Sequence, residues 1–272
     1  MAEAAGVAVI ADRDNPGGFI VELDGTPQSY VDTTDPANLV FEYVRRIGHV
    51  VDLVADPHDP VTAVHLGGGG MTVPRYVAHT RPGSRQQVIE ADRAVIDAVR
   101  RELPMPRGAQ IRVRCADARN AATVLPAGML GTVDLLVVDV FAGARTPAGL
   151  TTVEFFRSLL PLLAPGGVVA VNAADGGGLA FARALTATVA ESLGPVTIVA
   201  EPGVLKGRRF GNLVLVTGPV DPIAFARRAA SDPFPATVVG GAEAVRFPGG
   251  ARPRTAATAD DSPAPPQGLF RR

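Results

Sequence analysis

The chain has 272 residues, 47% of them hydrophobic, with a formal net charge of -1 and a pI near 6.4, so it offers no basic field for a nucleic-acid partner. Its length allows one main α/β core with a smaller appendage. Cys115 is the only cysteine, which excludes an intramolecular disulfide or a cysteine-based zinc site and indicates a reducing compartment.

Residues 1–58 are predicted to form a β-rich appendage with one helix. The apolar runs 7–10 and 19–23 are separated by turn sequences rich in Asn, Asp, Pro and Gly, which is typical of a small antiparallel meander. Between about residues 36 and 53, apolar residues recur every three or four positions behind an early Pro, so a helix is predicted there. The Pro-rich stretch 56–60 then breaks the pattern and marks the boundary with the main domain.

Residues 59–246 are predicted to form an α/β domain, because strand and helix patterns alternate as in a mostly parallel sheet covered by helices on both faces. Helices are expected between the strands, and a last one at 222–230. The strands are expected at residues 61–66, 87–90, 111–115, 133–139 and 168–172, with 196–200 and 212–217 as a final antiparallel pair. Residues 247–272 are rich in Pro, Gly, Ala, Asp and Arg without periodicity, so a disordered tail is predicted.

Four consecutive glycines, Gly67 to Gly70, separate the first of these strands from a helix. Glycine lets the backbone approach a ligand closely, and the helix that follows offers unpaired N–H groups, so a polar or anionic ligand is expected at this turn. Glu90 ends the next strand, about 20 residues further on, where nucleotide-binding sheets place an acid on the ribose hydroxyls. Glu90 is therefore a candidate ribose contact; the alternative is that it, like Asp92, only begins the next helix.

Two more acids lie at the carboxyl ends of strands, where open α/β sheets carry their ligand crevice. Asp117 precedes the small Ala118, so its carboxylate can accept from an exocyclic amino group while a flat ring such as adenine lies alongside; helix capping is the alternative. Asp139 follows an apolar run, which favours a raised pKa and a role in orienting or deprotonating an attacking amine; initiation of a turn is the alternative. The four histidines form no cluster, and His65 is expected in the core, so no metal site is predicted.

These motifs together resemble the spermidine synthase (polyamine aminopropyltransferase) family. The resemblance covers roughly residues 19–218 and rests on the glycine turn with Arg75, the runs 88–92, 117–118 and 134–139, and Leu23 to Gln28, which is similar to the family's Leu-Asp-Gly-x-x-Gln. It implies a methyltransferase-like, Rossmann-type α/β domain behind a small antiparallel β domain. Members of the family are often dimers, so a homodimer is the expected assembly.

The resemblance also implies a ligand and the residues that bind it. The ligand is decarboxylated S-adenosylmethionine or S-adenosylmethionine, bound as a co-substrate without a metal, and the partner is a small-molecule amine or other acceptor. By this resemblance the donor would be held by Gly67, Gly68, Gly69 and Glu90, its adenine by Asp117 and Ala118, and its tail would lie near Gln28. Asp139 falls on the position of the family's catalytic acid.

The sequence departs from the family at the residues that would face a cationic amine. The family's Gly-Gly-Gly-Asp-Gly-Gly has Gly70 in place of its Asp, and the next two residues are not glycine. The family's Asp-x-x-Asp-Pro corresponds to residues 139–143, which keep the first acid but lack the second. The family's Tyr-Gln or Tyr-His pair is also missing from the helix near Leu39 and Val40. Each charged hydrogen bond lost in this way would cost roughly 1.5 to 3 kcal/mol of attraction for a diamine.

Three functions are open on this basis. The first is aminopropyl transfer from decarboxylated S-adenosylmethionine to an amine that Asp139 orients or deprotonates. The second is methyl transfer from S-adenosylmethionine to an acceptor less cationic than a polyamine, which the apolar loop after Asp139 favours. The third is a nucleoside-binding protein without turnover. A plain NAD enzyme is disfavoured, because the spacing of Gly-x-Gly-x-x-Gly is not met.

The location expected for this protein is the cytoplasm. No basic segment leads into an unbroken apolar one at the N-terminus, as it would in a secretory signal. No stretch approaches the ~20 apolar residues of a membrane helix, so no membrane partner is expected either.

Overall fold

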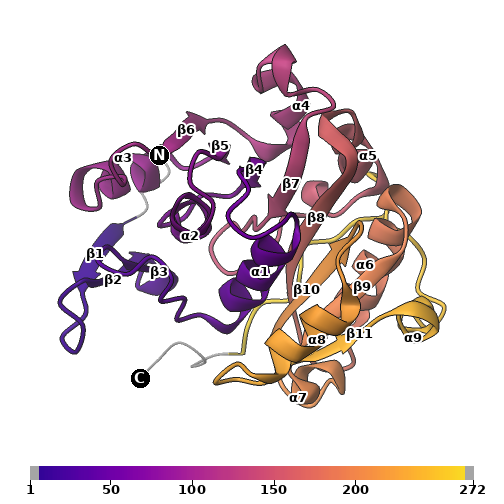
Figure 1. The fold of residues 1–272 in the computed structure, drawn as a ribbon. Coiled ribbons are helices and arrows are strands. Elements are labelled where there is room, and N and C mark those ends of the chain that lie inside the picture. The colour runs from indigo at the N-terminus through magenta and orange to yellow at the C-terminus, as the bar shows by residue number, and fades with distance from the viewer. Residues whose placement is uncertain (1–5, 267–272) are drawn as a thin grey trace.

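The computed structural model describes residues 6–266 of the 272-residue chain, which form two β-sheets with helices around them. A three-stranded antiparallel sheet has the order β1-β2-β3, and an eight-stranded sheet has the order β11-β9-β10-β8-β7-β4-β5-β6. Figure 1 shows the small sheet, in indigo, beside the end of the large sheet that carries β5 and β6. The predicted α/β fold with a small antiparallel β part is confirmed.

The elements follow the predicted alternation of strand and helix. The strands are β1 (Val7–Ala11), β2 (Gly18–Leu23), β3 (Thr26–Asp32), β4 (Thr62–Leu66), β5 (Arg85–Glu90), β6 (Gln110–Cys115), β7 (Val133–Val138), β8 (Leu163–Asp175), β9 (Val196–Ala200), β10 (Gly211–Thr217) and β11 (Thr237–Val239). The helices are α1 (Glu42–Leu53), α2 (Thr72–Thr80), α3 (Arg93–Glu102), α4 (Ala121–Val124), α5 (Val153–Leu159), α6 (Ala180–Leu193), α7 (Pro202–Leu205), α8 (Pro222–Ala230) and α9 (Gly241–Arg246). None of the helices within residues 6–266 is long and apolar enough to cross a membrane.

The large sheet reverses its strand order at β4. This strand pairs in parallel with both β5 and β7, while β6 and β8 extend the sheet on either side. The chain therefore runs outward from β4 through β5 to β6, and then returns to build β7 and β8 on the other side. Ligands of open α/β sheets bind outside the carboxyl ends of the strands at such a reversal. A ligand site is therefore expected outside the carboxyl ends of β4 and β7.

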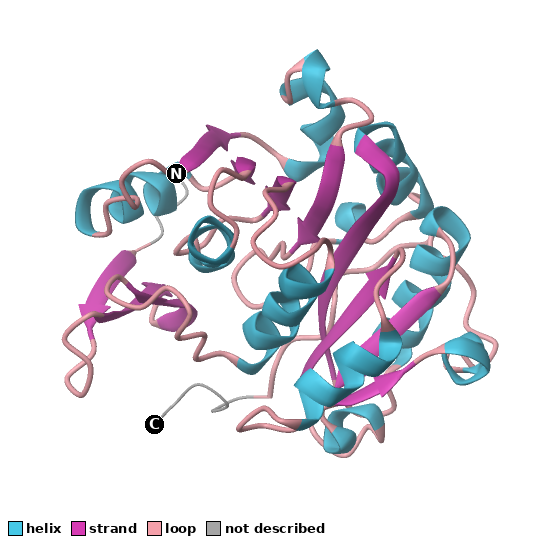
Figure 2. Ribbon diagram, in the orientation of Figure 1, coloured by secondary structure: helices cyan, strands magenta, loops and turns pink. Residues whose placement is uncertain are grey.

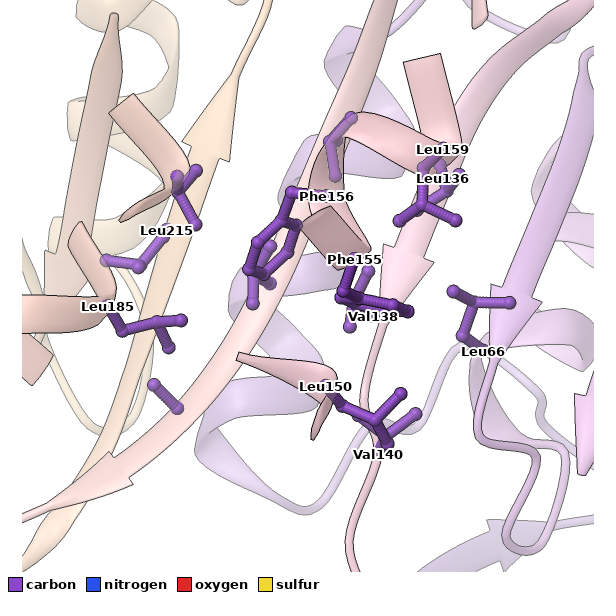
Figure 3. Close-up of a cluster of buried hydrophobic side chains, with 14 of the residues drawn as sticks. Leu66, Leu136, Val138, Val140, Leu150, Phe155, Phe156, Leu159, Leu185 and Leu215 are labelled. Carbon is purple, nitrogen blue, oxygen red and sulfur yellow. The ribbon is translucent and has the colours of Figure 1, made fainter. Parts of the chain in front are cut away.

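Helices cover both faces of the large sheet because its central strands are apolar on both sides. In β7, Leu136 and Val138 pack with Phe155 and Phe156 of α5, whereas the alternate residues face α1, α2 and α8. Figure 3 shows the first cluster, and Figure 2 shows helices in front of and behind the strands. A strand buried on both faces explains the unbroken apolar run that precedes Asp139.

The helix predicted for residues 36–53 begins later than expected, at Glu42. The carboxylate of Asp32 accepts from the second and third backbone amides after it and from the side chain of Asn38, which holds this stretch in turns. The predicted start is wrong, because apolar spacing does not reveal such a local hydrogen-bonded turn. Helix α1 packs on the large sheet. The domain boundary near residue 58 stays a prediction, with α1 lying against the main domain.

The small sheet packs over the start of α2 and against α3. Its inward side chains Val21 and Val31 share a buried cluster with Met71, which precedes α2, and with Val95 of α3. The hydroxyl of Thr72 donates to a carbonyl of β3 at 2.8 Å. This packing brings β3 and the β2–β3 turn over the glycine turn that follows β4.

Residues 247–266 are ordered against the domain, so the prediction of a disordered tail is wrong for this part of the chain. The side chain of Ser262 is fully buried, at 0% exposure, and the amide of Arg254 donates to the hydroxyl of Thr188 at 2.8 Å. Small polar residues are held here by hydrogen bonds rather than by a periodic apolar face, which composition does not reveal. The rest of the predicted tail, residues 267–272, lies outside the described residues, as do residues 1–5.

Candidate active site

A cavity of about 810 Å³ lies over the carboxyl ends of β4, β5, β6 and β7. The β2–β3 turn forms one side of it, and the loop 140–150 after β7 forms another. Every residue that the sequence selects lines this cavity: Gln28, Gly67, Gly68, Gly69, Glu90, Asp117, Ala118 and Asp139. The structure therefore brings these residues together in one place, while the part of a ligand that each would contact stays a prediction.

The glycine turn is closely packed, and its amides are engaged by the protein itself. Gly67 has φ +86°, and a Cβ there would collide with the backbone carbonyl of Asp139. One carboxylate oxygen of Glu90 accepts from the amides of Gly68 at 2.8 Å and Gly69 at 3.2 Å, and the other accepts from the amide of Asp92 at 2.9 Å. Glu90 thus fixes the turn, and these two glycine amides are not free to hold an anionic ligand.

Gly70, where the family pattern has Asp, lies directly beneath the small sheet. A Cβ at this position would lie 2.7 Å from Val31 Cγ2 and 2.9 Å from Ser29 Cβ. The Gly70 amide donates to the Ser29 hydroxyl at 2.9 Å, and Ser29 lines the cavity beside Gln28. Ser29 was not selected from the sequence, because nothing in the local pattern connects β3 with a turn 41 residues away. The packing of β3 explains the departure at Gly70.

We expect Gly70→Asp to lower the free energy of unfolding by roughly 1 to 3 kcal/mol, because the new side chain must displace β3. The matched control is Gly128→Asp, since a Cβ at Gly128 meets no atom within 4 Å. Urea denaturation of both variants measures the difference. A Gly70→Asp protein as stable as the control would contradict the close packing of β3 on the turn.

Asp139 is the most perturbed acid in the cavity. Burial raises its pKa to about 6, against the lowering effect of the nearby Asn172 amide and Tyr43 hydroxyl. The Asn172 side-chain amide donates to Asp139 Oδ1 at 2.8 Å. Burial and the neighbouring Asp139 carboxylate raise the pKa of Tyr43 well above its ordinary value, so its hydroxyl remains a donor. The predicted rise in the pKa of Asp139 is confirmed.

Tyr43 and Asn172 are residues of the site that sequence reasoning missed. Tyr43 is part of the apolar spacing that predicts the first helix, and it lies one helical turn beyond Leu39 and Val40, where the family's tyrosine pair is expected. Asn172 lies in β8, is only 3% exposed, and its Oδ1 has no hydrogen-bond partner among the described residues. Both positions carry a usable signal, because a Tyr or Asn set within an apolar pattern needs a polar partner for its hydroxyl or amide.

Asp117 and Ala118 lie at the other end of the cavity. Asp117 accepts from the amide of Arg119 at 2.8 Å and caps a short 3-10 turn, which is the alternative role considered from the sequence. The hydrogen bond from the Arg119 side chain is the main cause that lowers the pKa of Asp117. Asp92 caps α3 as expected. His65 is buried, as expected of a core residue, and its Nε2 lies 2.9 Å from Oε1 of Gln86.

The charge of the cavity lining favours a cation. Six carboxylates line it against two guanidinium groups. Both guanidinium groups are already paired, Arg93 with Asp97 at 3.1 Å and Arg119 with Asp117 at 2.6 Å. Within residues 6–266, no group of three His, Cys, Asp or Glu side chains is arranged to hold a metal ion. The lining acids are Glu22, Asp24, Glu90, Asp92, Asp117 and Asp139.

A solved structure identifies the family. The chain is 32% identical to a probable spermidine synthase from Corynebacterium glutamicum, whose crystal structure gives a TM-score of 0.84 and matches 93% of this chain and 94% of that one. The chain belongs to the spermidine synthase family. The resemblance seen in the sequence motifs is thereby confirmed, and the departures at Gly70 and after Asp139 are departures within that family.

Other comparisons give weaker support. Curated polyamine aminopropyltransferases of Chromobacterium violaceum and Vibrio vulnificus are 27% identical over 148 residues and 31% identical over 144 residues. These matches cover 54% and 53% of this chain and 54% and 46% of those proteins, so the chain spans about half the length of the curated relatives it matches. No family model matches the sequence.

More distant structures share the fold alone. The spermidine synthase of Thermotoga maritima is 16% identical, with a TM-score of 0.60 over 91% of this chain and 81% of that one. The human methyltransferase-like protein 13, solved in complex with SAH, is 17% identical, with a TM-score of 0.51 over 69% of this chain and 92% of that one. These likenesses agree with the methyltransferase-like architecture of the large sheet.

Proposed function

We propose that this protein is a transferase that binds decarboxylated S-adenosylmethionine and transfers its aminopropyl group to an amine. The observation that carries the proposal is the half-buried Asp139, which accepts from Asn172 and lies beside Tyr43 at the edge of an acidic cavity. The family relatives support it, since they are named spermidine synthases or polyamine aminopropyltransferases. A decarboxylated sulfonium donor with its free amine carries two positive charges, which suit this cavity.

The donor is proposed to lie along the ends of the strands. Glu90 would accept from a ribose hydroxyl, because its carboxylate has about four acceptor sites and uses three of them on backbone amides. Asp117 and Ala118 would flank the adenine, and Gln28 with the glycine turn would contact the tail. This arrangement would direct the reactive carbon of the donor toward Asp139.

The reaction is an in-line displacement that depends mainly on alignment. The acceptor nitrogen forms a bond to the propyl carbon next to the positive sulfur, the carbon–sulfur bond breaks, and methylthioadenosine leaves. Asp139 takes the proton from the acceptor ammonium, which frees the nitrogen lone pair. Asn172 holds the Asp139 carboxylate in place by donating to it, and the Tyr43 hydroxyl lies beside the same carboxylate.

Donor selection tests the proposal against methyl transfer, which the apolar residues after Asp139 also favour. S-adenosylmethionine carries an extra carboxylate, and the cavity offers it neither free glycine-turn amides at Gly68 and Gly69 nor an unpaired guanidinium group. Calorimetry should therefore show decarboxylated S-adenosylmethionine binding about tenfold or more tightly than S-adenosylmethionine. Equal or tighter binding of S-adenosylmethionine would contradict aminopropyl transfer and support the methyltransferase alternative.

The pH dependence of the reaction should report Asp139. With its pKa raised to about 6, the carboxyl is largely ionised at neutral pH and gains a proton below about pH 6, where it can no longer accept one. The value of kcat/KM should therefore fall on an acidic limb centred at about 6, measured with saturating donor and limiting acceptor. A limb near pH 4, where an ordinary aspartate titrates, would mean that an Asp139 with a raised pKa does not control the reaction.

A further inference from the structure

The loop 140–150 forms the wall of the cavity nearest to Asp139. Seven of its residues line the cavity, and both of its ends, Val140 and Leu150, belong to a buried hydrophobic cluster, as Figure 3 shows. Between those ends the loop is built mainly from Gly, Ala and Pro, and its backbone is held within the loop by one short pairing, between Ala142 and Arg145, and by a 3-10 turn at Ala148–Leu150. Such a stretch has few side chains of its own to hold its shape.

The middle of this loop is held by residues from the far end of the chain. The Thr146 amide donates to the Ser262 hydroxyl at 2.8 Å, and the Ser262 amide donates back to the Thr146 carbonyl at 2.9 Å. Arg145 Nε donates to the Ser262 carbonyl at 2.6 Å, and the Ala148 amide donates to Asp261 Oδ1 at 2.9 Å. Ser262 is fully buried in this contact. Four hydrogen bonds therefore join the loop to two consecutive residues.

Residues 254–262, here called the C-terminal strap, are also anchored at their other end. The Arg254 amide donates to the Thr188 hydroxyl of α6, and the Arg254 carbonyl accepts from the amide of Val153 at the start of α5, both at 2.8 Å. The Arg254 guanidinium lies 5.1 Å from the centre of the Phe181 ring. In Figure 1 the yellow chain after α9 runs back past α6, so the strap connects these helices to the loop beside the cavity.

We propose that the C-terminal strap is part of the acceptor side of the site, and that Asp261 and Ser262 are positioning residues that hold the loop 140–150 in the shape that admits the acceptor. The loop begins directly after Asp139, so its position decides where an acceptor amine lies relative to that carboxylate. The strap supplies the acceptors for two loop amides, those of Thr146 and Ala148, from its side chains. The effect on the acceptor rests on the proposed function; the effect on the loop does not.

Amide hydrogen exchange in the full-length protein tests whether the strap holds the loop 140–150 in place. The double variant Asp261→Ala/Ser262→Ala removes both side-chain acceptors, and the control Thr258→Ala changes a strap residue whose side chain bonds only within the strap, to Thr255. Exchange of the Thr146 and Ala148 amides should accelerate about tenfold or more in the double variant and stay at the wild-type rate in the control. Trypsin should also cleave after Arg145 faster only in the double variant. Unchanged exchange in the double variant would overturn the inference.

Steady-state kinetics on the same proteins tests whether the strap affects binding of the acceptor amine. The double variant should raise the KM for the amine about fivefold or more, while its calorimetric affinity for the donor stays within about twofold of wild type. A loss of donor affinity as large as the rise in KM would show a general structural effect and overturn the positioning role. If the wild-type protein turns over no amine, the proposed function fails by itself, and the exchange measurement still decides whether the strap holds the loop.

Discussion

Replacing Asp139 by Asn should lower kcat by roughly 10²- to 10⁴-fold, the range that a positioned proton acceptor contributes. Asn keeps the size of the side chain and one oxygen for the Asn172 bond, but it cannot take a proton from the acceptor ammonium. Donor affinity should change by less than about threefold, since the donor contacts lie on the glycine turn, Glu90 and Asp117. Initial rates of methylthioadenosine release with saturating donor, together with donor calorimetry, measure both effects.

The control for this experiment is Asp56→Asn, the same chemical change at an exposed residue outside the cavity. It should keep the wild-type rate. An Asp139→Asn enzyme with more than half of the wild-type kcat would show that Asp139 neither takes the proton nor orients the amine. A parallel loss of donor affinity would instead place Asp139 among the donor contacts.

Replacing Glu90 by Ala should weaken donor binding by about 10- to 100-fold, because one carboxylate both fixes the glycine turn and is the proposed ribose contact. The variant would leave the amides of Gly68, Gly69 and Asp92 without their present acceptor. Glu90→Gln keeps one acceptor oxygen and should lie between Ala and wild type. Calorimetric titration with decarboxylated S-adenosylmethionine and with methylthioadenosine measures the loss.

Glu102→Gln provides the control for the Glu90 variants, because Glu102 lies on α3 with an exposed side chain outside the cavity. Its donor affinity should equal that of wild type. Methylthioadenosine lacks the aminopropyl group but keeps the ribose, so it should lose affinity in the Glu90→Ala protein as well. Retention of full affinity for both ligands would remove Glu90 from the ribose site.

The acids of the site could be predicted from the sequence because each follows a recognisable strand. Glu90 ends one parallel strand, and Asp117 and Asp139 follow the ends of two others within two residues; the carboxyl ends of parallel strands meet at one edge of a sheet. The glycine turn could be predicted for a similar reason, since its four glycines stand between a strand and a helix. Local patterns are enough to predict these residues as one site, because the order of the parallel strands brings their carboxyl ends together without any further long-range contact.

The residues that sequence reasoning missed depend on contacts between distant segments. Tyr43 reaches Asp139 only because α1 packs on the large sheet, and Ser29 reaches Gly70 only because β3 lies over the glycine turn. Ser262 is buried against Thr146 across 116 residues of chain, so a composition typical of disorder gave the wrong expectation. In all three cases no local sequence pattern points to the role of the polar residue, because its partner comes from a distant segment that only the tertiary fold brings near.

Product analysis with the intact protein tests the central claim most directly. The protein is incubated with decarboxylated S-adenosylmethionine and, in separate reactions, with putrescine, longer diamines and apolar monoamines. The proposed function predicts methylthioadenosine and an aminopropylated amine in equal amounts with at least one acceptor, and no methylthioadenosine with the Asp139→Asn variant above about a hundredth of that rate. Absence of methylthioadenosine with every acceptor, or formation of S-adenosylhomocysteine from S-adenosylmethionine, would contradict aminopropyl transfer.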